Sequence, residues 1–356
     1  MSGRSDARVA LAAILLATAC ARTTTSGPAA AYPVVPASAR ASATSIPAPP
    51  PARWLGLLGE YGDGALFRIV AEQDGRLQLV DSALHVTRLA ERGDARFVTD
   101  PGGERADFER DATGHGTALL LGSARLPRNE IEPRAGTNQL RVKPVRPVEE
   151  LRAEALAASP PAEAGPFSAS DLVELVKLDS TIHLEIRYAT TNNFLGTRFY
   201  DEARAFMQRP AADALVRAHR ALRPLGYGLL IHDAYRPWYV TKMFWDAVPL
   251  DTRWLVADPA QGSRHNRGAA VDLTLYELAT GRPVEMPSTY DESTERAYAD
   301  YPGGTTRQRW HRALLRRVME AEGFQFNAHE WWHFDHSTWR SYAINNVAFD
   351  RIATPR

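Results

Sequence analysis

The chain has 356 residues, of which 44% are hydrophobic and 24% are charged, a composition typical of a soluble globular protein with room for two domains. Its 42 Lys and Arg residues balance its 42 Asp and Glu residues, so no net field steers it toward nucleic acid, and we expect no nucleic-acid partner. Cys20 is the only cysteine, which excludes an intramolecular disulfide and a thiolate metal site. Any metal must therefore be held by His and carboxylate side chains.

Residues 1–20 have the pattern of an export signal. Arg4 and Arg8 precede an apolar run that is too short to span a bilayer as a stable helix. Small residues directly before Cys20 resemble a bacterial lipoprotein processing site. We therefore expect a protein exported to the periplasm or cell envelope, with a lipid on Cys20 as its sole membrane contact. Simple secretion, with Cys20 lost in the cleaved signal, is the alternative.

Three segments of different composition follow the signal. Residues 21–53 are rich in Ala, Pro, Ser and Thr and predict a flexible, disordered tether. Residues 54–147 show short apolar alternations, such as Ala65 to Val70 and Leu77 to Val80, separated by Gly- and Asp-rich turns. They predict a small all-β sandwich or barrel, whose partner the sequence does not indicate. Residues 148–167 begin with a helix-prone stretch and end in Pro-Pro and Gly-Pro, and we interpret them as a linker.

Residues 168–356 mix helix and strand patterns without regular βαβ repeats, which predicts an α+β domain. Amphipathic helices are expected over residues 210–222 and 307–322, and Gly323 ends the second. Buried strands are expected over residues 228–232 and 271–276.

The first candidate cluster is the stretch SRHNRGAAVDLTL at residues 263–275. Strand alternation places Asp272 opposite three apolar side chains, where a carboxylate is costly unless something pairs with it. Gly268 permits a turn that folds His265 back over Asp272, and imidazole with carboxylate suits zinc. Each residue also has an ordinary alternative, a turn histidine or a hydrogen-bonded structural carboxylate.

The second cluster, HEWWHF at residues 329–334, matches the pattern H-E-x-x-H, in which both histidines bind zinc from one helix face. We reject that interpretation because it needs several helical turns, whereas this segment is aromatic-rich and follows the helix stop at Gly323. It would also leave the first cluster unexplained. We expect Glu330 and His333 to share one side of a single turn, with His333 as a ligand and His329 incidental. The alternative is that the two tryptophans are core residues which their neighbours cap.

The third cluster, IHDAYRPW at residues 231–238, places Arg236 where a buried strand meets a helix that begins at Pro237. Such a junction attracts anions, because backbone N–H groups and the helix dipole point toward it. A guanidinium there can stabilise developing negative charge. A structural salt bridge is the alternative for Arg236.

Taken in this order, S-x-H-x-x-G-x-A-x-D, D-A-Y-R-P and E-W-W-H resemble the motifs of the D-alanyl-D-alanine dipeptidase family, the VanX-type zinc peptidases. The stretches RYATTNNFLGTRFY at residues 187–200 and DLTLYELATGRPVEMPSTYDE at residues 272–292 agree with that family as well. The resemblance covers residue 168 to the C-terminal region. It implies a central antiparallel sheet with flanking helices, one zinc ion per chain, and hydrolysis of D-alanyl-D-alanine to two D-alanines.

The resemblance also implies roles for individual residues. The zinc ligands it implies are His265, Asp272 and His333. Glu330 is implied as the general base, and Arg236 as the stabiliser of the transition state. Tyr188 and Asp291 fall where the family contacts the free ammonium group of the substrate, and Ser263 falls at the edge of the same pocket.

The signal, tether and β domain depart from this family, most of whose members are compact single domains. An exported enzyme meets the dipeptide only after wall turnover, so we expect a role in cell-wall peptide turnover rather than in glycopeptide resistance. One alternative is a D,D-carboxypeptidase or endopeptidase that acts on peptidoglycan stem peptides. Another, of a different class, is a non-catalytic cell-wall-binding module with a vestigial site.

Overall fold

The computed structural model describes residues 45–129 and 141–352, all of which belong to one compact unit. The predicted signal, Cys20 and most of the predicted tether lie outside the described residues, so export and lipidation stay predictions. Within the described part of the chain, no helix combines the length and the apolar character needed to span a membrane.

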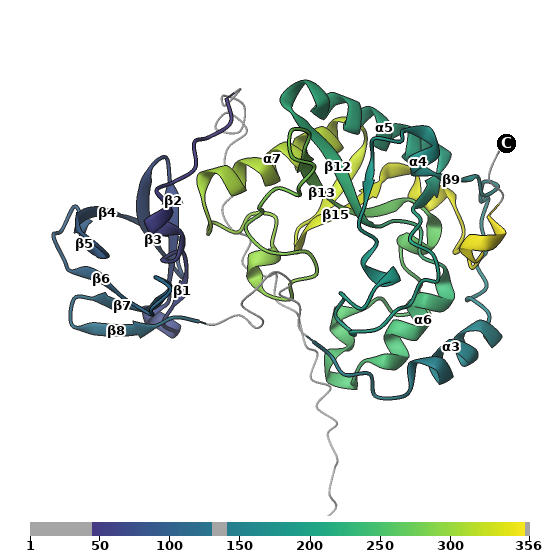
Figure 1. Ribbon diagram of the computed structural model, residues 1–356. Helices are drawn as coiled ribbons and strands as arrows, with labels where there is room; N and C mark the ends of the chain where they lie inside the picture. The colour runs from purple at the N-terminus through teal and green to yellow at the C-terminus, as the bar shows by residue number, and fades with distance from the viewer. Residues whose placement is uncertain (1–44, 130–140, 353–356) are drawn as a thin grey trace, which may run out of the picture. The chain divides into compact units, whose positions relative to one another are not determined.

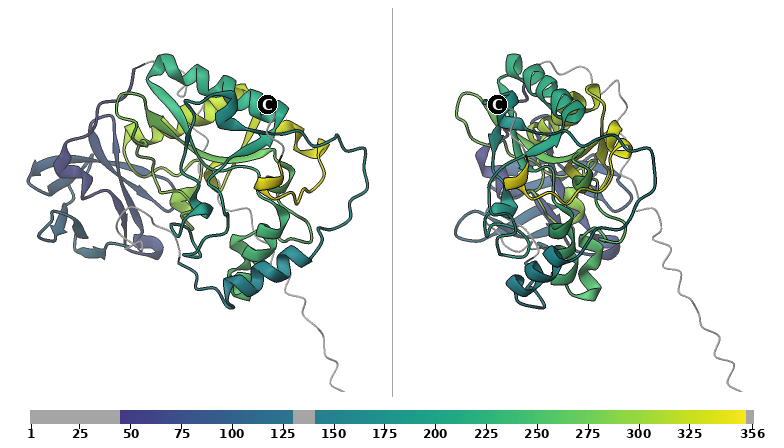
Figure 2. Two further views of the ribbon diagram at one scale, coloured as in Figure 1. Left: turned by 45° about the vertical axis from the view of Figure 1, so that its right-hand side comes forward. Right: turned by 90° about the vertical axis from the view of Figure 1, so that its right-hand side faces the viewer.

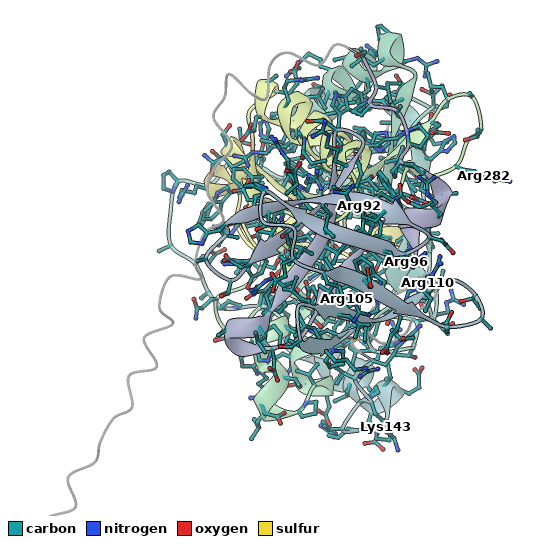
Figure 3. The ribbon with its side chains drawn as sticks, turned by 90° about the vertical axis from the view of Figure 1, so that its left-hand side faces the viewer. Arg92, Arg96, Arg105, Arg110, Lys143 and Arg282 are labelled. Carbon is teal, nitrogen blue, oxygen red and sulfur yellow. The ribbon has the colours of Figure 1, made fainter. Side chains whose placement is uncertain are left out.

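A β-rich segment, residues 59–127, forms two antiparallel sheets with the strand orders β1–β2–β3–β4–β5 and β6–β7–β8 (Figure 1). The strands are β1 Gly59–Tyr61, β2 Arg68–Gln73, β3 Arg76–Asp81, β4 Val86–Gly93, β5 Arg96–Asp100, β6 Ala106–Arg110, β7 Gly116–Leu121 and β8 Ala124–Pro127. Buried side chains of both sheets, including Tyr61, Phe97 and Leu119, share one apolar core. The alternation over residues 77–80 lies in β3, whereas that over residues 65–70 lies in β2 only from Arg68, because residues 64–66 form a short helix. The domain boundary stays a prediction. Arg92 and Arg96 are exposed on the surface of this segment (Figure 3).

The β-rich segment contacts the start of helix α7 (Thr306–Ala321). Glu72, only 2% exposed, accepts a hydrogen bond of 2.8 Å from the backbone N–H of Thr306 at its Oε2 atom. Arg309 donates to the backbone oxygen of Glu72 over 2.6 Å. A carboxylate at a helix N-terminus is favourable because it complements the helix dipole.

The C-terminal half is built on a five-stranded sheet of order β10–β12–β13–β15–β14. Its strands are β10 His183–Leu184, β12 Tyr227–Asp233, β13 Ala270–Glu277, β14 Phe324–Asn327 and β15 Glu330–His336. All neighbours pair antiparallel except β10 and β12, which are parallel. Val271, Leu273 and Leu275 of β13 are fully buried in the core, and Asp272 and Thr274 therefore project from the other face, as strand alternation predicts. The prediction of an α+β architecture with a mainly antiparallel sheet is confirmed.

Helices cover this sheet where the hydrophobic pattern predicted them. Helix α5 (Arg209–Leu222) buries Leu215, Val216 and Leu222, and it lies beside α7 over the sheet (Figures 1 and 2). Helix α7 begins with a capping box at Thr305 and ends before Gly323, whose φ of +85° requires a left-handed backbone.

Two further helices pair at another part of the C-terminal half. Helix α6 (Trp238–Ala247) begins directly after Pro237, which is its N-cap residue. Helix α3 (Val148–Ala157), in the segment predicted to be a linker, packs against α6 and buries Leu151 and Ala155 in the same core.

The remaining regular elements are short. The strands β9 (Leu172–Glu174) and β11 (Phe206–Gln208) form a two-stranded sheet. The short helices are α2 Ala52–Leu55, α4 Leu175–Leu178, η1 Gly64–Leu66, η2 Arg187–Ala189, η3 Arg223–Leu225, η4 Leu250–Leu255, η5 His265–Arg267, η6 Glu295–Ala297, η7 Ser337–Ser341 and η8 Phe349–Arg351.

Candidate metal centre

Three side chains from separate elements converge in the C-terminal half: His265 from η5, Asp272 from β13 and His333 from β15. Asp272 and His333 are direct partners in the pairing of β13 with β15. His265 reaches them because Gly268 closes the turn in a left-handed conformation, with φ of +70°. A side chain at Gly268 would also meet Leu172 at 2.6 Å, so the turn needs glycine for two reasons.

The spacing of the three groups fits a tetrahedral metal ion. His265 Nε2 lies 3.3 Å from His333 Nδ1 and 3.5 Å from Asp272 Oδ1, and the latter two atoms are 3.0 Å apart. Ligand atoms about 2.0–2.1 Å from a tetrahedral zinc ion are about 3.3–3.4 Å from one another. Two imidazoles and one carboxylate therefore form a donor set that can hold a metal ion and leave its fourth position open.

Each of these groups is oriented by a partner behind it. His265 Nδ1 donates to the backbone oxygen of Ala234 over 2.7 Å, and His333 Nε2 lies 3.0 Å from Asp335 Oδ1. Because a carbonyl or a carboxylate can only accept, each imidazole carries its proton on that side and turns its other nitrogen to the centre.

The electrostatics of the site couple Asp272 to His333. Burial opposes charge on both groups, yet neighbouring histidine charge and hydrogen bonds lower the pKa of Asp272, and hydrogen bonds to Asp272 and Asp335 raise the pKa of His333. These shifts favour a proton on His333 Nδ1 beside Asp272 Oδ1. A bound cation would take that proton's place next to Asp272.

Glu330 lies beside the centre, but on a strand rather than on the turn that we expected. The prediction of a single turn is wrong, because residues 330–336 pair with β13 and β14 as strand β15. The register of β14 with β15 shifts between Phe326 and Asn327, so residues 331–333 have no partner on β14. In a regular strand, residues three apart point to opposite faces. The irregularity breaks that alternation and leaves Glu330 Oε2 only 3.9 Å from His333 Nδ1.

The H-E-x-x-H match is not a helical metal site. His329 is exposed in the turn that precedes β15, where its ring packs against Tyr298. Glu330 lines the pocket at the centre, with 41% of its side chain exposed. Desolvation raises the pKa of Glu330, and the positive charge of His333 partly opposes that rise.

Arg236 is buried on the same pocket, which has a volume of about 300 Å³. Its Nε and Nη2 atoms donate to Asp233 Oδ2 over 3.0 and 2.7 Å. Asp233 is held in turn by the hydroxyl of Tyr200 at 2.7 Å, and the guanidinium lies over the rings of Tyr188 and Phe244. The salt bridge that we weighed as the alternative is therefore present, and it aims the guanidinium into the pocket rather than away from it.

The three residues predicted to contact substrate line this pocket too. The Tyr188 hydroxyl donates to Asp291 Oδ2 over 3.0 Å. Burial, the negative charge of Asp272 and that of Glu330 raise the pKa of Asp291 to about 8, although the bond from Tyr188 opposes this. Ser263 accepts a hydrogen bond of 3.2 Å from the backbone N–H of His265 at the pocket edge.

Sequence reasoning missed the groups that support the site. Asp335 follows His333 by two positions, so alternation along a strand would have placed both on one face, had the strand been predicted. Asp233 precedes Arg236 by three positions, and its negative charge was a signal that it could pair with the guanidinium. Tyr290, whose hydroxyl lies 3.1 Å from Asp272 Oδ2, gave no local signal because 18 residues separate it from its partner.

In a comparison with known proteins, residues 168–350 match a family model described as D-ala-D-ala dipeptidase. The chain is similar to the D-alanyl-D-alanine dipeptidase of Escherichia coli K12, with 33% identity over 186 residues, 52% of this chain and 95% of the relative. It is similar to that of Enterococcus faecalis V583, with 35% identity over 181 residues, 44% of this chain and 88% of the relative. That of Streptomyces coelicolor is 33% identical over 182 residues, 46% of this chain and 90% of the relative.

Proposed function

The chain belongs to the D-Ala-D-Ala dipeptidase family of peptidases, and from this premise we propose that it is a zinc-dependent enzyme that hydrolyses D-alanyl-D-alanine to two D-alanines. The observation that carries the proposal is the single pocket in which His265, Asp272 and His333 meet at metal-ligand spacing, with Glu330 and Arg236 on its wall. Two imidazoles with one carboxylate are a typical ligand set of catalytic zinc.

Each residue of the pocket has a separate role in the proposed hydrolysis. A zinc ion held there would supply Lewis acidity, which polarises the scissile carbonyl and makes water a stronger acid. Glu330 receives the proton of the attacking water and returns it to the nitrogen of the leaving amine. The raised pKa of Glu330 suits this exchange, because a carboxyl with a pKa nearer to neutrality both accepts and donates a proton readily.

Arg236 stabilises the negative charge that develops on the carbonyl oxygen. Its two contacts with Asp233 fix the guanidinium in place before substrate binds, so little reorganisation is needed during the reaction. The rings of Tyr188 and Phe244 keep water from that side and strengthen the interaction.

Asp291 selects a free dipeptide in this proposal. Its carboxylate lines the pocket, and the Tyr188 hydroxyl fixes one of its oxygens. An ammonium group placed against Asp291 sets the number of residues before the cleaved bond. Pairing with that ammonium also offsets the cost of ionising a buried carboxyl.

We place the activity in cell-wall peptide turnover, outside the cytoplasm. The apolar run before Cys20 supports export, and the small residues next to Cys20 support a lipid anchor. Free D-alanyl-D-alanine becomes available outside the cytoplasm when wall peptides are degraded.

A second candidate, a D,D-carboxypeptidase of stem peptides, is favoured by one observation. A cavity of about 570 Å³ adjoins the pocket and shares Tyr188, Asp291 and Glu330 with it. A longer peptide could lie there if it passed Asp291. The metal-loaded wild type and Glu330→Ala should therefore be assayed on free D-alanyl-D-alanine and on a stem pentapeptide. We expect the wild type to prefer the dipeptide and the variant to lose activity, whereas preference for the pentapeptide would overturn the proposal.

A further inference from the structure

A second cavity of about 500 Å³ lies on the other side of Tyr290 from the metal centre. It shares no lining residue with the pocket around the metal ligands. Strands β12 and β13 provide His232 and Thr274 to its wall, and the short helix η2 provides Arg187. Gly59 of the β-rich segment lines it as well.

Polar atoms without hydrogen-bond partners gather in this cavity. Among the described residues five buried side-chain atoms have no hydrogen-bond partner, and four of them belong to its lining: Nδ1 of His232, Oγ1 of Thr274, and Nε and Nη1 of Arg187. The carboxylate of Glu185 lies 3.1 Å from that Nε and 3.7 Å from that Nδ1. His232 and Thr274 are only 3% and 4% exposed. Buried polar groups are nearly always satisfied, because leaving one unpaired is costly. Three such side chains around one hollow space therefore indicate a ligand.

The chemistry of these groups indicates which ligand they suit. Arg187 has its Nε atom 3.1 Å from Glu185 Oε1, which leaves Nη1 to interact with something else. Burial and the charge of Arg187 lower the pKa of His232 to about 3, although a hydrogen bond with the backbone of Glu185 opposes this shift, so the ring is neutral. A guanidinium with a hydroxyl and a neutral imidazole matches the two oxygens of a carboxylate.

We propose that this cavity is a second binding site, which takes a small carboxylate between Arg187 Nη1, the Thr274 hydroxyl and His232. Tyr290 separates it from the metal centre: its ring stacks on His232 at 4.4 Å between centroids, and its hydroxyl bonds to Asp272. The carboxylate therefore binds without touching a metal ligand. The inference does not depend on which peptide the metal centre cleaves.

The NMR signals of the His232 ring nitrogens test directly whether a ligand occupies the cavity. The full chain, loaded with metal and labelled with ¹⁵N in its histidines, is titrated with sodium acetate and, separately, with ethylammonium chloride at equal ionic strength. His232 is assigned by the signal that His232→Gln removes. We expect acetate to move that signal in a saturable way, with an affinity in the millimolar range, about what so small a ligand can reach. Ethylammonium, of similar size but opposite charge, should leave the signal in place.

Thr274→Val keeps the shape of the side chain and removes its hydroxyl. We expect acetate to bind at least about 10-fold more weakly to this variant, because one of three donors is lost. Thr191→Val, at an exposed threonine away from the cavity, should bind acetate as the wild type does. Arg187→Met provides a second variant, which should abolish the acetate response. The inference is overturned if acetate leaves the His232 signal unmoved, if Thr274→Val binds it as tightly as the wild type, or if ethylammonium produces the same shift.

Discussion

The hydroxyl of Tyr290 donates a hydrogen bond of 3.1 Å to Oδ2 of Asp272, while Oδ1 of the same carboxylate lies 3.0 Å from His333 Nδ1. Each oxygen of Asp272 therefore has a separate role. Tyr290 holds one oxygen, and the other faces the two histidines. Partners behind a metal ligand usually affect metal affinity strongly, because they fix the ligand's orientation.

Tyr290→Phe tests this relationship. The substitution keeps the ring that packs on His232 and Trp332 but frees Asp272 Oδ2. We expect metal affinity to fall by about 10- to 100-fold, measured by competition with a chelator. Tyr227→Phe is the matched control, since it removes a buried hydroxyl that lies 3.0 Å from His311, away from the centre. Equal metal affinity in both variants would show that the Tyr290 hydroxyl does not orient Asp272.

Glu330→Gln separates catalysis from metal binding. An amide cannot take a proton from water, so we expect kcat to fall by at least about 100-fold with metal content unchanged. His329→Ala should retain both activity and metal, because His329 is exposed in a turn. Loss of metal in His329→Ala would revive the H-E-x-x-H site that the strand geometry argues against.

Arg236→Lys tests the electrostatic role of the guanidinium. A lysine keeps the charge but cannot reproduce the two contacts with Asp233, so we expect kcat to fall by about 100- to 1,000-fold with a smaller change in KM. Arg204→Lys is the matched control, since Arg204 makes a similar pair of bonds to Glu174, of 3.0 and 2.8 Å, away from the pocket. A similar loss of kcat in both variants would point to general destabilisation instead.

Asp291→Asn should change how stability depends on pH. The pKa of Asp291 is raised from 3.8 to about 8, so between these values the folded chain holds a proton that the unfolded chain releases. Stability contributed by this group is therefore lost as the pH rises through that window. Asparagine tolerates the positive φ of 59° at this position. We expect the Tm of the variant, relative to wild type and after chelation, to rise from about pH 5 to about pH 8 and then level off. A Tm difference that is independent of pH would contradict the raised pKa.

The local patterns of the sequence anticipated much of this architecture. Alternation along residues 271–276 placed Asp272 opposite the core side chains, and Gly268 indicated the turn that carries His265. Both features depend only on neighbouring residues, which is why they could be predicted. The amphipathic helix over residues 210–222 is present for the same reason.

Features that depend on distant contacts escaped prediction. The spacing of Glu330 and His333, three apart in an aromatic-rich segment after Gly323, predicts a single turn, whereas pairing with β13 and β14 decides that residues 330–336 form a strand. The bond between Tyr290 and Asp272 joins segments that become neighbours only after the sheet has formed. The buried polar atoms of His232 and Thr274 that lack hydrogen-bond partners likewise become visible only once β12 and β13 are paired.

The most direct test compares kcat/KM of the metal-loaded chain for D-alanyl-D-alanine and for its N-acetylated form. Acetylation removes the ammonium group that Asp291 is proposed to bind and leaves the scissile bond unchanged. We predict that the free dipeptide is cleaved at least about 100-fold more efficiently, because the acetylated form offers no ammonium group to pair with the buried carboxyl of Asp291. Equal or better cleavage of the acetylated form would contradict a dipeptidase built around His265, Asp272, His333 and Asp291.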